Sequence, residues 1–257
     1  LRLSEEGKSV GIFTKSKDPS TTNTNWAQGG IIYSDDDKLS GDIAVASSNT
    51  SFAPAVNKIA EHSKKLVTKY LLEQANTVFN RENGDLKYTK EAAHSLSRII
   101  YCGDYTGKSI QESLIKLVKS KKNIEIVTEH TAIDLITLNH HGLDPYDKYR
   151  DNQVLGVYFL NQGKVKTVLA PFTILATGGV GNLYLNTTNS EASRGDGHAM
   201  VRRAGGVLLD MEFIQFHPTT LFLKNSNKEK ALKERRFLLT EAIRGEGGIL
   251  LNAAGER

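Results

Sequence analysis

Short apolar runs rich in β-branched residues alternate along this chain with stretches whose apolar residues recur at helical spacing. Residues 9–14, 124–127 and 172–177 have the composition of buried strands, whereas residues 53–79 and 111–119 carry apolar side chains on one helical face. Strands that alternate with helices form βαβ units, in which the strands are parallel. The pattern therefore predicts an α/β protein with a parallel sheet of the dinucleotide-binding (Rossmann-like) kind.

A second group of strands interrupts this alternation. Residues 132–136, 154–160 and 164–169 are further β-rich runs, and the dipeptide Gln162-Gly163 separates the last two. A two-residue turn with glycine is typical of a β-hairpin. We therefore expect a β-meander inserted into the α/β fold.

Both ends of the sequence indicate a fragment of a longer protein. Residues 1–7 read as the tail of a helix that leads into the strand at residues 9–14, which is the second half of a βαβ unit. We expect the first strand, and any glycine-rich phosphate loop, to precede Leu1. Residues 252–257 form a polar turn without a closing element.

Composition excludes several classes of protein. The formal net charge is +4, and the lysines are dispersed except in residues 116–122 and 224–233, which read as solvated surface, so we expect no nucleic-acid partner. Cys102 is the single cysteine, which excludes a disulfide or thiolate metal site and agrees with a reduced, cytoplasmic location. No apolar run approaches the roughly 20 residues that span a bilayer, so we expect no membrane anchor. We also expect no metal centre.

Two glycine motifs follow loops or strands. Paired glycines end the stretch Trp26-Ala27-Gln28-Gly29-Gly30, and a second pair ends Ala176-Thr177-Gly178-Gly179 at the close of an apolar run. Glycine pairs let a ligand approach the backbone, and ligands bind at the carboxyl ends of strands in open α/β sheets. An ordinary tight turn explains either motif alone equally well.

A third motif begins a helix. Gly195-Asp196-Gly197 precedes a helical stretch that ends near Gly205, and its backbone amides could bind a phosphate or a carbonyl oxygen. Taken alone, the motif is better explained by Asp196 acting as the N-cap of the helix.

The fourth motif combines acid–base side chains. His217 ends an alternating strand immediately before a proline, at a position where a strand leaves its sheet. Thr240, Glu241 and Arg244 are spaced to share one helix face, where they could bind a dicarboxylate and transfer a proton. A surface ion pair between Glu241 and Arg244 is the alternative.

In order and spacing, these four motifs resemble the flavoprotein family of fumarate reductase, succinate dehydrogenase and L-aspartate oxidase. Residues 211–218 and 239–248 carry the most specific part of the resemblance. It implies a Rossmann-like FAD-binding domain with the inserted β-meander over residues 1–210. Residues 211–257 would then begin an α+β capping domain of the fumarate reductase type.

Two positions distinguish the branches of this family. Asn23 stands where the membrane-bound members have the histidine that bonds covalently to the flavin, so the resemblance implies non-covalent FAD. Glu91, in the stretch Glu91-Ala92-Ala93-His94-Ser95, matches a glutamate of the L-aspartate oxidase branch. A carboxylate there could pair with the substrate's ammonium group, although an exposed glutamate at a helix start is the alternative.

The match to the L-aspartate oxidase branch has four departures. Ala92 and Ala93 replace paired glycines, and Tyr101 replaces a histidine. Arg194 precedes the glycine–aspartate turn where a small polar residue is usual, and residues 47–50 replace a glycine-rich stretch. These differences place the local loop geometry in question and leave the family resemblance intact.

The resemblance implies oxidation of L-aspartate to iminoaspartate, with oxygen or fumarate as acceptor, as the first step toward quinolinate and NAD. It also implies a functional link to quinolinate synthase. The residues expected to contact FAD are Lys15, Asn23, Thr24, Asn25, Trp26, Ala27, Gln28, Gly29, Gly30, Ala176, Thr177, Gly178, Gly179, Gly195, Asp196 and Gly197. The residues expected to act on the substrate are Glu91, His217, Thr240, Glu241 and Arg244.

Two alternatives remain at this point. A soluble fumarate reductase or a succinate dehydrogenase flavoprotein subunit shares most of the motifs but lacks the glutamate of Glu91. A non-catalytic binding module with the flavoprotein fold is favoured by Arg194 and by the alanine pair. We also expect residues 1–257 by themselves to be inactive, because further substrate-binding residues of the family would follow Arg257.

Overall fold

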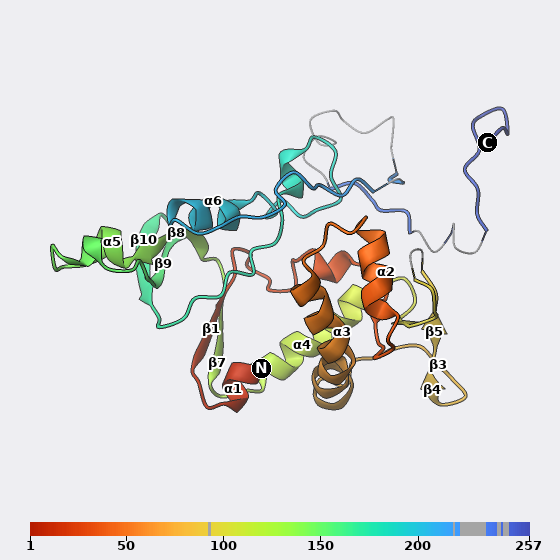
Figure 1. Cartoon of the computed structure of the whole chain (residues 1–257), viewed down its shortest axis with the longest axis horizontal. Helices are drawn as coiled ribbons and strands as arrows, with labels where there is room; N and C mark the ends of the chain where they lie inside the picture. Colours follow the sequence, from red (N-terminus) through yellow and green to blue (C-terminus); the bar gives the residue numbers. More distant parts are fainter. Residues whose placement is uncertain (92–93, 218, 222–234, 241–242, 244–246) are drawn as a thin grey trace. The chain divides into compact units, whose positions relative to one another are not determined.

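The structure is a computed structural model of the chain (Figure 1), and it describes all residues except 92–93, 218, 222–234, 241–242 and 244–246. The helices and helical turns are α1 (Arg2–Glu5), η1 (Thr24–Trp26), α2 (Leu39–Ala46), α3 (Ala53–Val67), η2 (Thr68–Gln74), α4 (Thr106–Lys119), α5 (Leu138–His141), η3 (Asp147–Tyr149), η4 (Gly181–Leu183) and α6 (Asp196–Arg203). The strands are β1 (Val10–Phe13), β2 (Ile31–Ile32), β3 (Arg81–Glu82), β4 (Asp85–Leu86), β5 (Tyr88–Thr89), β6 (Ile99–Ile100), β7 (Ile124–Val127), β8 (Thr131–Thr137), β9 (Val154–Asn161) and β10 (Lys164–Leu169).

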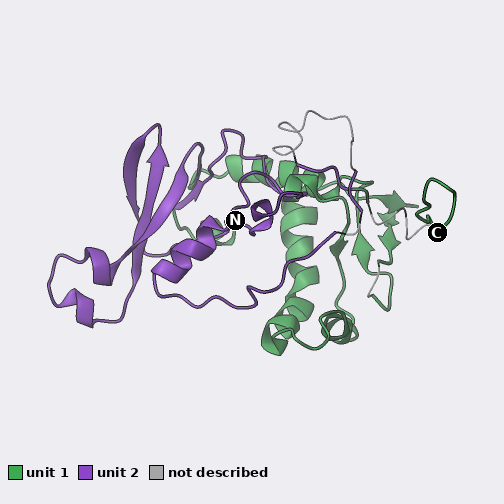
Figure 2. Cartoon of the chain, turned by 90° about the horizontal axis from the view of Figure 1, so that it is seen from above, with its two compact units in different colours: residues 1–9, 24–124, 239–257 green, residues 10–23, 125–238 purple. Residues whose placement is uncertain are grey.

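The chain forms two compact units (Figure 2). Unit 1 comprises Leu1–Ser9, Thr24–Ile124 and Leu239–Arg257, and unit 2 comprises Val10–Asn23 and Glu125–Leu238. Each unit draws on segments far apart in the sequence. No boundary between these units lies at residue 210, and the predicted division into an FAD-binding and a capping domain there stays a prediction.

Unit 1 contains helices α2, α3 and α4 and a small antiparallel sheet in the order β2-β6-β5. Helix α3 begins with Pro54 in its first turn, where a missing N–H costs nothing, and continues directly into the π-helical turn η2. Leu71, Phe79 and Ile100 form the buried core. The expected helix at 111–119 is confirmed, and the one expected at 53–79 is confirmed as far as Gln74, where η2 ends.

Unit 2 is built around the antiparallel sheet β10-β9-β8, which confirms the predicted β-meander. Gln162 and Gly163 both have positive φ, 49° and 74°, as a two-residue hairpin turn requires. Leu135, Val157 and Met200 are buried between this sheet and α6. Strand β1, which is hydrogen bonded to β7, adds Phe13 to the core, where its ring stacks on Phe159.

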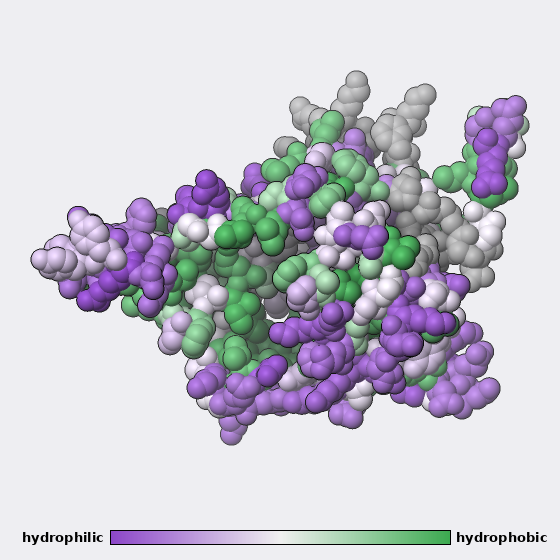
Figure 3. Space-filling model, viewed as in Figure 1, coloured by the Kyte–Doolittle hydropathy of each residue, from purple (hydrophilic) through white to green (hydrophobic). Residues whose placement is uncertain are grey.

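Two expected strands are absent from the described residues. Residues 172–177 and 211–217 have no strand hydrogen bonds, and Phe172 and Ile174 are 87% and 75% exposed. Apolar side chains therefore reach the surface (Figure 3). An apolar run becomes a strand only where a neighbouring strand supplies backbone partners, so composition alone overestimated the sheet here.

Helix α6 ends as the sequence predicts. Its last residue is Arg203, and Gly205 follows in the left-handed conformation with φ 82°. Over the part of the chain that the structure describes, no helix has both the length and the hydropathy needed to cross a bilayer.

Candidate functional site

In unit 2, Lys15 and Asp196 form an ion pair, although they are 181 residues apart in sequence. Lys15 Nζ lies 3.1 Å from Asp196 Oδ2, and both side chains are partly exposed. A partly exposed pair contributes little stability. The ion pair holds the cationic side chain of Lys15 beside the first turn of α6.

The two glycine motifs of unit 2 pack directly against each other. The amide of Gly195 donates a hydrogen bond to the carbonyl oxygen of Gly179 at 3.3 Å. A Cβ atom at Gly197 would collide with the Thr177 hydroxyl. The sequence Gly195–Gly197 is therefore required by packing against the strand-end residues and by the φ of 80° at Gly195.

This arrangement leaves a backbone surface that a ligand can approach. Cβ atoms built at Gly178 and Gly179 would meet no atom of the described residues within 4 Å, apart from those of their neighbours in the chain. Gly195 is the N-cap of α6, and Asp196 makes no side-chain capping bond, so the N-cap explanation of Asp196 is wrong. Open glycine backbone, a helix N-terminus and Lys15 together suit an anionic group such as a phosphate.

Asn23 connects its loop to the segment that precedes Gly195. Its Nδ2 donates to Asn189 Oδ1 at 2.7 Å and to Ser193 Oγ at 2.9 Å, and its Oδ1 accepts from the Ser190 amide at 2.8 Å. Both ends of the carboxamide are thus engaged. The sequence does not indicate that Asn189 and Ser193 bind Asn23, because they lie more than 160 residues from it.

In unit 1, the residues Thr24–Gly30 lie against the first turn of α4 and against β6. The amide of Gly107 donates to the Ala27 carbonyl oxygen at 2.9 Å. A Cβ at Gly30 would lie 2.5 Å from the Ile100 carbonyl oxygen, so Gly30 is required by close packing. Packing, rather than approach of a ligand, accounts for this glycine of the motif.

Glu91 contacts the same loop from the hairpin that joins β5 and β6. Its Oε1 accepts a hydrogen bond from the Gly30 amide at 3.2 Å, and a Cβ at Gly29 would lie 3.4 Å from that oxygen. The structure thus brings together Glu91 and the Trp26–Gly30 motif, which lie more than 60 residues apart in the sequence.

The predicted substrate-binding residues are only partly described. His217 Nδ1 lies 2.9 Å from the Thr219 carbonyl oxygen, and Thr220 forms an antiparallel bridge with Leu238 in unit 2. Thr240 belongs to unit 1. Glu241 and Arg244, and with them the predicted helix face, lie outside the described residues.

Two buried histidine nitrogens are further candidates for ligand contacts, and neither was predicted from the sequence. Nδ1 of His94 and Nδ1 of His198 are inaccessible to solvent and have no hydrogen-bond partner among the described residues. His198 lies in α6 next to the Gly195 turn, and His94 lies three residues after Glu91. In the sequence, these two residues are marked only by their positions beside Glu91 and beside the Gly195-Asp196-Gly197 motif.

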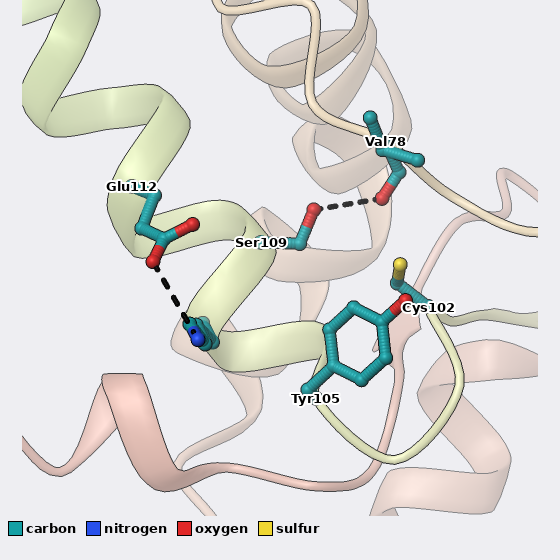
Figure 4. A pocket seen from close by; sticks show the side chains of 6 residues that line it. Val78, Cys102, Tyr105, Ser109 and Glu112 are labelled. Carbon is teal, nitrogen blue, oxygen red and sulfur yellow. Dashed lines mark hydrogen bonds and ion pairs between the residues drawn. The ribbon is translucent and has the colours of Figure 1, made fainter.

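A pocket of about 490 Å³ lies in unit 1 (Figure 4), and none of the predicted site residues lines it. Its lining residues are Val78, Cys102, Tyr105, Lys108, Ser109 and Glu112. The hydrogen bond with the Cys102 thiol raises the pKa of the Tyr105 phenol. The pocket is therefore distinct from the glycine motifs and from Glu91.

Comparison with known proteins relates these motifs to a family. The whole chain, residues 1–257, matches the FAD binding domain model. The chain is 36% identical over 265 residues to the chloroplastic L-aspartate oxidase of Oryza sativa subsp. japonica, covering 100% of this chain and 39% of that protein. It is 35% identical over 263 residues to the L-aspartate oxidase of Halobacterium salinarum, covering 100% of this chain and 48% of that protein.

Solved structures are similar as well. The Mycobacterium smegmatis Sdh1 complex in the apo form has a TM-score of 0.79 at 27% identity, over 99% of this chain and 43% of the other. A quinol-fumarate reductase with menaquinol molecules has a TM-score of 0.81 at 24% identity, over 100% of this chain and 42% of the other. The second likeness concerns the fold alone. The chain thus spans less than half of the length of these relatives.

Proposed function

The chain belongs to the FAD-binding domain family, and from that premise we propose that it is part of an enzyme that oxidises L-aspartate to iminoaspartate. Relatives named L-aspartate oxidase match all of it at about 35% identity. The contact between the Glu91 carboxylate and the Gly30 amide carries the proposal most directly. It holds an anionic side chain beside the loop that we assign to the flavin.

The described residues of unit 2 fit FAD. Gly178 and Gly179 offer open backbone, α6 offers its N-terminus, and Lys15 offers a cation for the pyrophosphate or ribose. When bound, FAD supplies the hydride acceptor, whereas the protein binds and orients the substrate. We propose contacts to residues 176–179 and 195–197 in unit 2 and to residues 24–30 in unit 1.

We propose that FAD is held without a covalent bond. The side chain of Asn23 is a carboxamide, which lacks the nucleophilic ring nitrogen of a histidine. Its three hydrogen bonds to residues 189–193 give it a role in holding the adjacent loop.

We propose a role for each residue toward the substrate's ammonium and carboxylate groups. Glu91 pairs with the ammonium group, which distinguishes aspartate from succinate. His217, Thr240 and Glu241 bind the carboxylates, and Arg244 supports them. We further propose oxygen or fumarate as the acceptor, and a place before quinolinate synthase in a route to quinolinate and NAD.

The test is a visible spectrum of the full-length protein during anaerobic titration with L-aspartate or succinate. We expect L-aspartate, but not succinate, to bleach the flavin, and acid precipitation to release the flavin into solution. Glu91→Gln should raise the KM for L-aspartate about tenfold, because a charge-assisted contact is lost. Glu82→Gln, a change of an exposed acid in β3 of the same unit, is the matched control.

A soluble fumarate reductase or a succinate dehydrogenase flavoprotein subunit is the second candidate, and the 27% identity to the Sdh1 complex supports it. A flavin spectrum that L-aspartate leaves unchanged would favour this candidate. Absence of flavin from the purified protein would favour a binding module of the same fold.

A further inference from the structure

We propose that Asp42, Ser95 and Arg98 form a clamp that positions Glu91, and that this clamp sets the preference for an amino dicarboxylate over a plain dicarboxylate. The inference rests on the proposed role of Glu91 and extends it to residues that do not touch the substrate. All three residues belong to unit 1. They are positioning residues, since they act through the hairpin loop that carries Glu91.

Arg98 is the fixed point of the clamp. Its side chain is 1% exposed, and its carbonyl oxygen accepts a hydrogen bond from the Tyr33 amide at 2.8 Å. Nη1 lies 2.7 Å from Asp42 Oδ2, and Nη2 lies 3.0 Å from Asp36 Oδ1. Because a guanidinium stays charged and a buried charge needs a partner, these two carboxylates are held tightly to it.

Asp42 connects Arg98 to Ser95 in the loop between β5 and β6. Its Oδ2 accepts hydrogen bonds from both the amide and the hydroxyl of Ser95, each at 2.8 Å, in addition to the bond from Arg98. The Ser95 amide is the main cause that lowers the pKa of the Asp42 carboxyl, so the carboxylate is ionised at neutral pH. One carboxylate oxygen therefore joins α2, Ser95 and Arg98.

Ser95 in turn restrains Glu91. The amide of His94, the residue directly before Ser95, donates a hydrogen bond to the Glu91 carbonyl oxygen at 3.2 Å. At the base of the hairpin, Thr89 pairs with Ile99. The Glu91 backbone is thus held between the strand pair and the Ser95 contact, while its carboxylate reaches the Gly30 amide.

The expected effect is on selectivity rather than on catalysis in general. A displacement of about 1 Å in a positioned group can change rates by about a hundredfold. A displaced Glu91 weakens contact with an ammonium group, which succinate lacks. A residue that served stability alone would affect binding of L-aspartate and of succinate in the same proportion.

The test compares Ser95→Ala and Asp42→Asn in the full-length, FAD-loaded protein. We measure kcat and KM for L-aspartate and the inhibition constant of succinate. The ratio of that KM to that inhibition constant should rise about tenfold, with a smaller change in kcat. A second readout is independent of turnover: hydrogen exchange in residues 88–100 should become faster in both variants.

Ser95→Ala removes the hydroxyl bond to Asp42 and keeps the Ser95 amide bond, Arg98 and both of its carboxylates in place, so it tests the hydroxyl contact of the clamp even if Asp42→Asn does not fold. Asp35→Asn is the control, because Asp35 is an exposed acid paired with Lys64, and it should change neither readout. A lower unfolding temperature with an unchanged ratio and unchanged exchange would overturn the proposal. If Glu91→Gln itself leaves the ratio unchanged, the proposed function fails, and the proposed clamp with it.

Discussion

Glu5 shows how a single carboxylate joins distant segments within unit 1. It accepts hydrogen bonds from Lys69 and Gln74, each at 2.6 Å, and from Tyr70 at 3.2 Å. These contacts, with Lys69 first, lower the pKa of the Glu5 carboxyl to about 2. They tie α1 to η2, and the sequence contains no local sign of them.

This lowered pKa predicts a pH-dependent contribution to stability. A carboxyl whose pKa is lower in the folded state stabilises the fold above its unfolded pKa of 4.5, and this contribution disappears as the pH falls toward 2. The unfolding temperature of Glu5→Gln should therefore lie below that of the parent at pH 6. The two should converge near pH 2.

Thermal unfolding followed by circular dichroism from pH 2 to pH 7 measures this difference. Glu6→Gln removes the neighbouring carboxylate, which lies 3.5 Å from Arg2 Nε in α1, and controls for the change in net charge. If the unfolding temperatures of the parent and of Glu5→Gln differ as much at pH 2 as at pH 6, the lowered pKa of Glu5 is not the cause.

At the scale of elements, two helical glycines have opposite roles. Gly107, in the first turn of α4, lies so close to Thr24 that a Cβ atom would collide with the Thr24 carbonyl oxygen. Gly41 lies inside α2, and a Cβ there would meet no atom of the described residues within 4 Å beyond its chain neighbours and the backbone of its own helix. Helix propensity alone favours alanine at both positions.

Gly107→Ala should therefore destabilise the protein by about 1–3 kcal/mol, because α4 must move away from the loop at residues 24–30. Gly41→Ala should stabilise it by about 0.4–1 kcal/mol. Urea unfolding of both variants measures the two free energies. If both variants change the free energy of unfolding equally and with the same sign, helix propensity rather than the contact with Thr24 determines the effect at residue 107.

At the scale of the whole molecule, the proposed FAD contacts occur in both compact units. A ligand that binds only the folded state stabilises it, by about 2.7 kcal/mol at 100 times its Kd. We expect FAD to raise the unfolding temperature. Riboflavin, which lacks the pyrophosphate and the adenosine, should raise it much less at the same concentration.

Hydrogen exchange then locates the effect of FAD. Exchange should slow in residues 24–30 of unit 1 and in residues 177–179 and 195–197 of unit 2. Slowing in one unit only would show that the other group of motifs has been assigned wrongly.

The fold class and the type of most elements could be predicted from the sequence. The α/β flavoprotein fold, the helix at 111–119 and the meander with its turn at Gln162-Gly163 are confirmed, because each depends on periodicity or on turn chemistry within a few residues. Residues 172–177 have the same strand-like composition, but the described structure supplies no paired neighbour. A strand forms only when a second segment supplies hydrogen-bond partners, and the composition of one segment does not show whether such a partner exists.

The motifs that identify the family were likewise determined by the sequence, since short runs such as Gly195-Asp196-Gly197 are visible by themselves. Only the tertiary structure decided their partners: Lys15 with Asp196, Asn23 with Ser193, and Arg98 with Asp42. These partners lie 181, 170 and 56 residues apart. Hydrogen bonds and ion pairs act over a few ångströms in space, so side chains this distant in sequence become partners only when the folded backbone brings them together.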